Sequence, residues 1–169
     1  MANIHPLACV SPLAKLGEHV EVGPYAFIDE NVEIGDYTKI HPHAAIYPYA
    51  KIGEHCEVFP GAVVSAIPQD LKFDGEVTHV EIGNYVTIGH NCIVHCRKIG
   101  NNSLIGMGSI ILGYTEIGDN CIIGAGTLLT QHKKIPNNCL VYGNPAKIIR
   151  AIRDDEIEAL RASAMRYFD

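Results

Sequence analysis

The chain has 169 residues, 47% of them hydrophobic and 19% charged, with a net charge of −6 at neutral pH. This length favours a single domain, and the acidic balance argues against nucleic acid as a partner. The sequence has no apolar run of roughly 18 residues and no basic, apolar leader, so we expect a cytoplasmic protein that makes no use of a membrane.

An aliphatic residue returns at every sixth position along most of the chain. The first row holds Ile4, Val10, Leu16, Val22, Ile28, Ile34, Ile40, Ile46, Ile52, Val58 and Val64. The later rows hold Ile82, Ile88 and Val94, and then, after a step of five, Ile99, Ile105, Ile111, Ile117, Ile123, Leu129, Ile135 and Val141. A helix repeats near 3.6 residues and a strand at two, so neither explains a period of six. A hexapeptide β-helix does, with three six-residue faces in each coil of about 18 residues. The count predicts about seven coils.

Two further positions of the repeat restrict the side chain. Glycine often follows the aliphatic residue, as at Gly17, Gly35 and Gly53, and we expect these glycines to adopt positive φ at turns. Four residues after the aliphatic position the side chain is small or β-branched, which suits a narrow prism. Five cysteines on or beside these positions are predicted to be small buried side chains. They are Cys9, Cys56, Cys92, Cys121 and Cys139. Cys96, beside His95, is the one cysteine that invites a test of reactivity.

The six-residue pattern resembles that of the hexapeptide-repeat acyltransferase superfamily. The resemblance implies an all-β fold, a left-handed parallel β-helix, which is an exception to the usual right-handed crossover. It also implies a homotrimer about an axis parallel to the stack of coils, with active sites between neighbouring subunits. We place the β-helix domain at residues 1–150 and a C-terminal helical segment, packed on it, at residues 151–169.

The first interruption of the rows predicts a loop. Eighteen residues separate Val64 from Ile82, one full coil by count, and the expected aliphatic positions between them hold acidic residues. We therefore expect residues 66–81 to leave the prism, with Pro68 to Val77 at the centre of the excursion, and the chain to return in phase. Loops on a rigid scaffold frequently carry function.

The loop sequence QDLKFDGE and the hexapeptides before it are similar to the acyl-carrier-protein-dependent UDP-N-acetylglucosamine acyltransferases of lipid A synthesis. This resemblance covers about residues 1–82. It implies that Asp70 and Lys72, with Gln69 beside them, bind the sugar nucleotide. The general-base histidine of that family falls on Gly113 in this chain.

Two histidines follow aliphatic positions closely, so their side chains are expected at turns. His90 lies two residues after Ile88, and His95 lies one residue after Val94. Two such imidazoles can bind a divalent metal, or one can act as a general base near neutral pH. On spacing alone, ordinary surface histidines explain the pattern equally well.

The run GHNCIVHCRKIGNNSLIGMGS, with the later GNPAKIIR, resembles the second half of γ-class carbonic anhydrase-like proteins over about residues 82–169. The resemblance implies that His90 and His95 are two of three zinc-type ligands, contributed across a subunit boundary. The third family histidine corresponds to Ser65, so the third ligand is unknown, with His79 and Asp70 as candidates. A complete catalytic zinc site cannot be assembled from the matched positions.

Two features near the end of the chain complete the pattern. Lys133 and Lys134 lie where coils of related proteins approach a cofactor's phosphates, so they are candidates to bind an anionic cofactor, with a solvated turn as the alternative. The stretch from Asp154 to Phe168 has apolar residues at helical spacing and an acidic first turn, which predicts an amphipathic helix.

Most of the other histidines are predicted to be solvated or to have a structural role. His5, His41 and His43 lie beside prolines and are predicted to be solvated. His19 and His55 occupy matching places in two repeats, which predicts a role in the repeat itself.

The sequence favours an acyltransferase. His90 is the candidate general base, and the loop residues Gln69, Asp70 and Lys72 hold a sugar nucleotide or similar small-molecule acceptor. Acyl-CoA or acyl carrier protein is the expected donor. The alternatives are a γ-carbonic anhydrase-like enzyme that hydrates CO2 at zinc or another divalent metal, and a catalytically silent trimeric scaffold.

Overall fold

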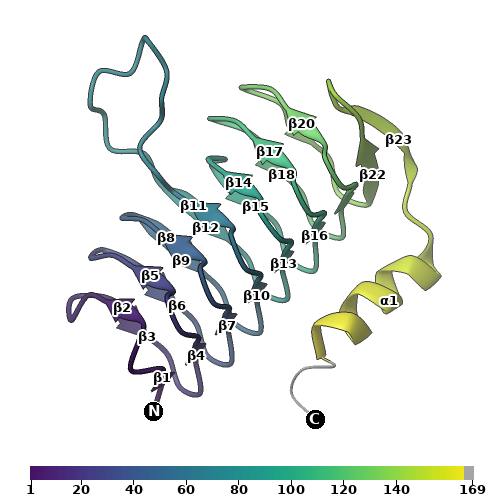
Figure 1. Ribbon diagram of the computed structural model, residues 1–169. Helices are drawn as coiled ribbons and strands as arrows, with labels where there is room; N and C mark the ends of the chain where they lie inside the picture. The colour runs from purple at the N-terminus through teal and green to yellow at the C-terminus, as the bar shows by residue number, and fades with distance from the viewer. Residues whose placement is uncertain (166–169) are drawn as a thin grey trace.

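The computed structural model describes residues 1–165, which form a left-handed parallel β-helix followed by one α-helix (Figure 1). Three sheets, here named A, B and C and parallel apart from the last strand pair of sheet A, make the three faces of a prism. Each coil adds one short strand to each face, because every sixth residue turns an aliphatic side chain inward. The fold class predicted from the six-residue period is therefore confirmed.

The strands alternate among the three sheets in chain order. Sheet A holds β1 (Asn3–Ile4), β4 (Glu21–Val22), β7 (Lys39–Ile40), β10 (Glu57–Val58), β13 (Thr87–Ile88), β16 (Leu104–Ile105), β19 (Ile122–Ile123), β22 (Cys139–Tyr142) and β23 (Lys147–Ala151). Sheet B holds β2 (Cys9–Val10), β5 (Phe27–Ile28), β8 (Ala45–Ile46), β11 (Val63–Val64), β14 (Ile93–Val94), β17 (Ile110–Ile111) and β20 (Leu128–Leu129). Sheet C holds β3 (Lys15–Leu16), β6 (Glu33–Ile34), β9 (Ala50–Ile52), β12 (Val80–Ile82), β15 (Lys98–Ile99), β18 (Glu116–Ile117) and β21 (Lys134–Ile135). Within the described residues this gives seven complete coils, and β22 opens an eighth.

The core is a column of aliphatic side chains inside the prism. Successive coils pair in register, so Ile88 of β13 lies opposite Ile105 of β16, and both are almost completely buried. Each fully buried side chain of this size stabilises the fold by about 1.5–3 kcal/mol. The strict period therefore matters energetically, because a shift of one residue would turn a whole row toward solvent.

The glycines after the aliphatic positions do not adopt positive φ, contrary to the prediction. The positive φ values fall two residues later, on His19, Tyr37, His55 and their counterparts in other coils. At Gly35 an added Cβ would lie 2.7 Å from the carbonyl carbon of Gly53 in the next coil. These glycines therefore serve close packing between coils rather than left-handed backbone geometry.

The loop enlarges one corner of the prism and replaces no coil. Strand β11 ends at Val64, and β12 begins at Val80 on the next face, where it pairs in register with β9 of the preceding coil. Residues 80 and 81 were predicted to belong to the loop, but they belong to β12. Figure 1 shows the loop projecting from the corner between sheets B and C, above an otherwise regular stack.

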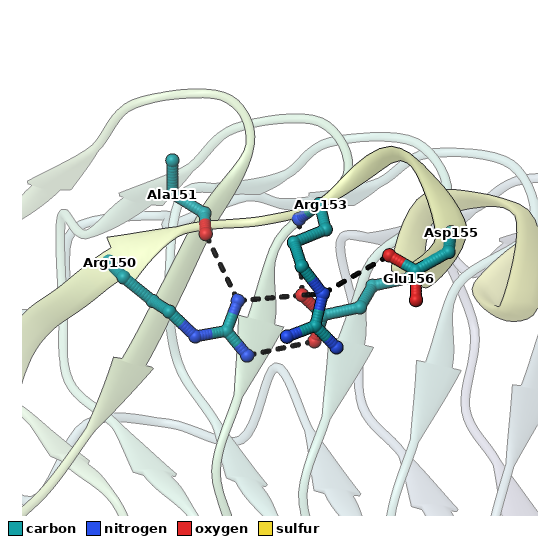
Figure 2. A network of polar contacts seen from close by, with 5 residues as sticks. All are labelled: Arg150, Ala151, Arg153, Asp155 and Glu156. Atoms are coloured by element: carbon teal, nitrogen blue, oxygen red, sulfur yellow. Dashed lines mark hydrogen bonds and ion pairs between the residues drawn. The ribbon is translucent and has the colours of Figure 1, made fainter.

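The chain leaves the prism through β23, which runs antiparallel to β22, and continues into α1 (Asp154–Met165) beside the coils (Figure 1). Arg150 donates to both carboxylate oxygens of Glu156 at 2.6 and 3.0 Å, and the backbone N–H of Arg153 donates to the same carboxylate (Figure 2). Asn102 reaches the carbonyl of Ile157 from the prism. The predicted helix extended to Phe168, which lies outside the described residues.

Within residues 1–165, no helix combines the length and apolar character needed to cross a membrane.

Candidate functional site

The outer faces of sheets B and C have opposite chemistry. On sheet C, lysine and glutamate alternate, and each charge lies in register with an opposite one: Lys15, Glu33, Lys51, Glu81, Lys98, Glu116 and Lys134. Every outward residue on the strands of sheet B is apolar: Cys9, Phe27, Ala45, Val63, Ile93, Ile110 and Leu128. Sheet C is suited to water, whereas sheet B is suited to contact with another protein surface.

His90 and His95 lie at opposite ends of β14, and so at the two corners that flank sheet B. His90 is exposed at the corner between sheets A and B, with its ring centre 4.9 Å from that of Phe59. His95 is half-buried at the corner between sheets B and C, at the foot of the loop. Burial lowers the pKa of His95, and a hydrogen bond with the backbone of Ala66 opposes that shift. His95 therefore favours the neutral form that can accept a proton or bind a metal.

The described part of one chain, residues 1–165, does not assemble a three-ligand metal centre. Among residues 1–165 no group of three histidine, cysteine or carboxylate side chains is placed to hold an ion. Ser65 lies one coil before His95 in the same corner, where its backbone N–H donates to the carbonyl of Val94. The Ser65 hydroxyl is buried and donates to the carbonyl of Pro48 at 2.8 Å.

The loop is tied to a corner three coils further along the stack. The Asp70 carboxylate accepts hydrogen bonds from the backbone N–H of Lys72 at 3.0 Å and from Nε2 of Gln131 at 3.2 Å. Both contacts lower the pKa of Asp70, and the hydrogen bond from Lys72 has the larger effect. Gln69 and Lys72 are exposed on the same loop. The sequence did not single out Gln131, because a contact over 61 residues leaves no local pattern.

The predicted anion-binding lysines lie next to that contact but differ from each other. Lys134 belongs to the outer face of sheet C, where its Nζ lies 3.8 Å from Glu116 Oε2. Lys133 is exposed beside His132 and does not belong to the row of paired charges on sheet C. The loop residues and Lys133 therefore share one corner of the chain, whereas His90 occupies a different corner.

A stack of cationic and aromatic groups lines the same corner as Gln131. The guanidinium carbon of Arg97 lies 5.7 Å from the ring centre of Tyr114, and that ring stacks on His132 at 4.9 Å. At Gly113, between these coils, a Cβ would meet no atom within 4 Å. The corner below the loop therefore offers positive charge, flat rings and free space together.

The prediction that His41 is solvated is wrong. His41 Nε2 lies 2.5 Å from Glu57 Oε1, and the two side chains are only 17% and 6% exposed. The His41 ring also stacks on Phe59 at 4.6 Å. His5 and His43 are exposed, as expected. The pairing was not visible in the sequence, because residues 41 and 57 become neighbours only when two coils stack.

The cysteines divide differently from the prediction. Cys9, expected to be buried, is exposed on sheet B, because its side chain points outward from β2. Cys96 is buried, and desolvation raises its pKa to about 12. Cys96 therefore has the environment of an unreactive core thiol.

These features define a hexapeptide β-helix with a loop held against one corner, and the comparison with known families agrees. The model for bacterial transferase hexapeptide repeats (six repeats) matches residues 13–48, 31–66 and 98–131, which together cover more than half of the chain. The chain belongs to this family.

Individual relatives include both acyltransferases and carbonic anhydrases. The UDP-N-acetylglucosamine O-acyltransferase of Sulfurihydrogenibium sp. is 47% identical over 113 residues, which cover 62% of this chain and 42% of the relative. A carbonic anhydrase of Geobacillus kaustophilus is 49% identical over 84 residues, covering 50% of this chain and 46% of the relative. The chain thus spans less than half the length of either curated relative.

Among solved structures, a hexapeptide transferase family protein from Anaplasma phagocytophilum superposes with a TM-score of 0.60 at 29% identity. The alignment covers 98% of this chain and 88% of the other. The similarity therefore extends over nearly the whole prism and not only over isolated repeats.

Proposed function

We propose that the protein is an acyltransferase that moves an acyl group from a CoA or acyl-carrier-protein thioester to a sugar nucleotide or similar hydroxyl-bearing acceptor. The hydrogen bond between Asp70 and Gln131 is the observation that carries this proposal. It holds the loop with Gln69 and Lys72 against a corner that also presents Arg97. An acceptor bearing phosphates would there meet cationic groups from the loop and from the coils.

We propose further that the working molecule is a homotrimer with sheet B facing the threefold axis. The outward row of sheet B is apolar along its length, and ring closure needs one surface to meet a different surface of the next copy. In that arrangement the corner between sheets A and B of one subunit meets the corner between sheets B and C of its neighbour. His90 of one subunit would then approach the loop of the next. This arrangement explains why His90 and the loop lie at different corners of a single chain.

The chemistry assigned to this boundary is general-base catalysis. His90 takes the proton from the acceptor hydroxyl as its oxygen attacks the thioester carbonyl. The carbon–sulfur bond then breaks, the acyl group stays on the acceptor oxygen, and the thiolate leaves with the proton returned by His90. Backbone N–H groups at the corner would stabilise the oxyanion. Lys133, with Lys134 beside it, is assigned to the phosphates of the donor.

The test is thiol release from acyl-CoA and from acyl carrier protein, with and without UDP-N-acetylglucosamine. We expect acceptor-dependent release that falls at least about a hundredfold in His90→Ala, as for loss of a general base. Gln131→Ala should raise the KM for the acceptor with a smaller change in kcat, because it frees the loop and leaves the base in place. His43→Ala is the matched control. Acceptor-independent hydrolysis, or no release from either donor, would overturn the proposal.

A metal-dependent function is the second candidate, and the position of His90 and His95 favours it. The same trimer would bring these two side chains together across the boundary, and a third ligand would need to replace Ser65 or come from the loop. A zinc ion held there would supply an activated water for CO2 hydration.

Metal analysis of purified protein separates the two candidates. About one zinc per subunit, lost in both His90→Ala and His95→Ala and accompanied by CO2 hydration, would establish the metal function. Metal-free protein with acceptor-dependent thiol release would remove it. Absence of metal, CO2 hydration and thiol release together would leave the catalytically silent scaffold.

A further inference from the structure

A groove of about 370 Å³ lies on the outer face of sheet A, on the first three coils. Its ends are marked by two histidines, His5 and His41, and its wall includes Asn3 and the ion pair of Glu21 with Lys39. The loop and the corner that carries Gln131 are on a different side of the prism. The groove is therefore apart from the loop, but it lies along the same corner as His90, which follows two coils later, and Phe59 between them contacts both His41 and His90.

The groove lies where a row of side chains along one corner lacks a ring. At the corner between sheets A and B, the first position after the aliphatic row holds His5, Gly23, His41 and Phe59 in successive coils. His41 and Phe59, one coil apart, stack at 4.6 Å. His5 and His41 are two coils apart, about 9.6 Å at the usual strand spacing. Gly23 between them carries no side chain, and Pro42 lies 2.9 Å from where its Cβ would be. The groove, lined here by Pro24 and Pro42, is large enough for one flat ring between the two imidazoles.

Hydrogen bonds fix the orientation of both imidazoles. Nδ1 of His5 accepts from the backbone N–H of Leu7 at 3.0 Å. His41 Nε2 and Glu57 Oε1 are hydrogen-bonded to each other at 2.5 Å. The second Glu57 oxygen is buried and has no hydrogen-bond partner among the described residues. The His41 ring is thus held from one edge by Glu57 and from one face by Phe59.

We propose that this groove is a binding site for a planar heteroaromatic ring, such as a nucleobase, which stacks between His5 and His41. The two imidazoles supply the faces, at the spacing that the rest of the ladder already uses. Asn3, Lys39 and Glu21 line the wall, where they can meet the polar edge of the ring. Glu57 is a positioning residue, since it acts through His41 and does not reach the ligand.

Adenosine and uridine are suitable probes, with ribose as the non-planar comparison. We expect either nucleoside to move the ring proton signals of His5 and His41 upfield in NMR spectra of the intact protein, and ribose to move neither. His41→Ala and His5→Ala should each weaken nucleoside binding about tenfold, as expected for the loss of one stacking partner.

His43→Ala is the matched control, because His43 is exposed at the same corner and stacks on Tyr25 outside the groove. It should bind the nucleosides within about twofold of the unchanged protein. Glu57→Gln should weaken binding and broaden the His41 signals while the His5 signals stay sharp. If neither nucleoside moves the His5 and His41 signals up to its solubility limit, or if His43→Ala weakens binding as much as His41→Ala, the proposal is wrong.

Discussion

Gly35 shows how a missing side chain holds the stack together. Its hydrogen faces the backbone of Gly53 in the next coil, so Gly35→Ala must push two coils apart. We expect a loss of about 1–3 kcal/mol in the free energy of unfolding, measured by denaturant titration.

Gly113→Ala is the matched control for that measurement. The space around a Cβ at Gly113 is open, and the backbone there does not have positive φ. The substitution should leave stability unchanged or raise it by up to about 1 kcal/mol, because it restricts the unfolded chain. Equal losses at Gly35 and Gly113 would contradict the packing explanation.

Cysteine reactivity in the folded protein should follow exposure and not sequence neighbours. We expect iodoacetamide at neutral pH to spare Cys96 in the folded protein, because its raised pKa and burial keep it a protonated thiol. Mass spectrometry of the labelled peptides measures this, with denatured protein as the fully labelled reference. Labelling of Cys96 in the folded protein at the rate of that reference would mean that its corner opens in solution.

Contacts between individual residues of different coils could not be predicted from the sequence. The inward rows follow from a period, and a period is visible in one dimension. The contacts of His41 with Glu57 and of Asp70 with Gln131 depend on which coil stacks on which, and on a loop that folds across several coils. Such pairs carry no spacing rule. The prediction of positive φ at the glycines was wrong because glycine serves both backbone freedom and close approach between coils. The sequence does not distinguish these two uses.

The α1 element is held by a small ionic network whose strength depends on pH. Two contacts lower the pKa of Glu156 to about 2, first the hydrogen bonds from Arg150 and then the backbone N–H of Arg153 (Figure 2). A lowered carboxyl pKa means that the stabilising contribution is complete above the unfolded value near 4.5. It is lost as the pH falls from there through about 2.

We therefore expect the protection of the α1 amides, that is, their hydrogen exchange relative to an unfolded chain at the same pH, to fall between about pH 4.5 and pH 2, before that of the prism core. In Glu156→Gln the protection of α1 should already be low at neutral pH and should change little on acidification. Asp154→Asn, at an exposed position of the same first turn, is the control and should keep the pH dependence of the unchanged protein. An identical profile in the unchanged protein and Glu156→Gln would exclude the network as the cause.

The elements themselves were largely predictable, because each is either a hexapeptide or an interruption of one. The loop was located by acidic residues at aliphatic positions, and α1 by its acidic start and helical spacing. The boundary at Val80 was missed because the residues that return to sheet C, Val80 and Glu81, precede the next aliphatic position. The direction in which the loop folds was not predictable, since it depends on the hydrogen bond to Gln131.

The whole molecule should be trimeric through sheet B, and one residue offers a direct test. Ile110 points outward from β17, the sixth of the seven strands of that sheet, and is 36% exposed in a single chain. Ile110→Lys would bury a charge against an apolar surface. We expect it to raise the protein concentration at which trimers dissociate at least about a hundredfold, as measured by size-exclusion chromatography with light scattering.

Glu81→Gln, an outward residue on the solvated sheet C, is the control for that experiment and should leave the trimer intact. A trimer that survives Ile110→Lys unchanged would place the interface on another face. A monomer in the unchanged protein would remove the shared boundary on which the assignment of His90 depends.

The step of five residues between Val94 and Ile99 has a consequence for how such chains arise. That coil is one residue short, yet Lys98 still pairs in register with Glu81, because a corner absorbs the difference in length. Neighbouring coils make nearly all of each other's contacts, so a join at a corner must satisfy only one coil on each side. Segments of different ancestry can therefore be spliced, duplicated or lost in whole coils without moving any other residue to a different face. In this architecture the unit that can be exchanged is the coil, and a chain whose two halves resemble two different enzymes is compatible with it.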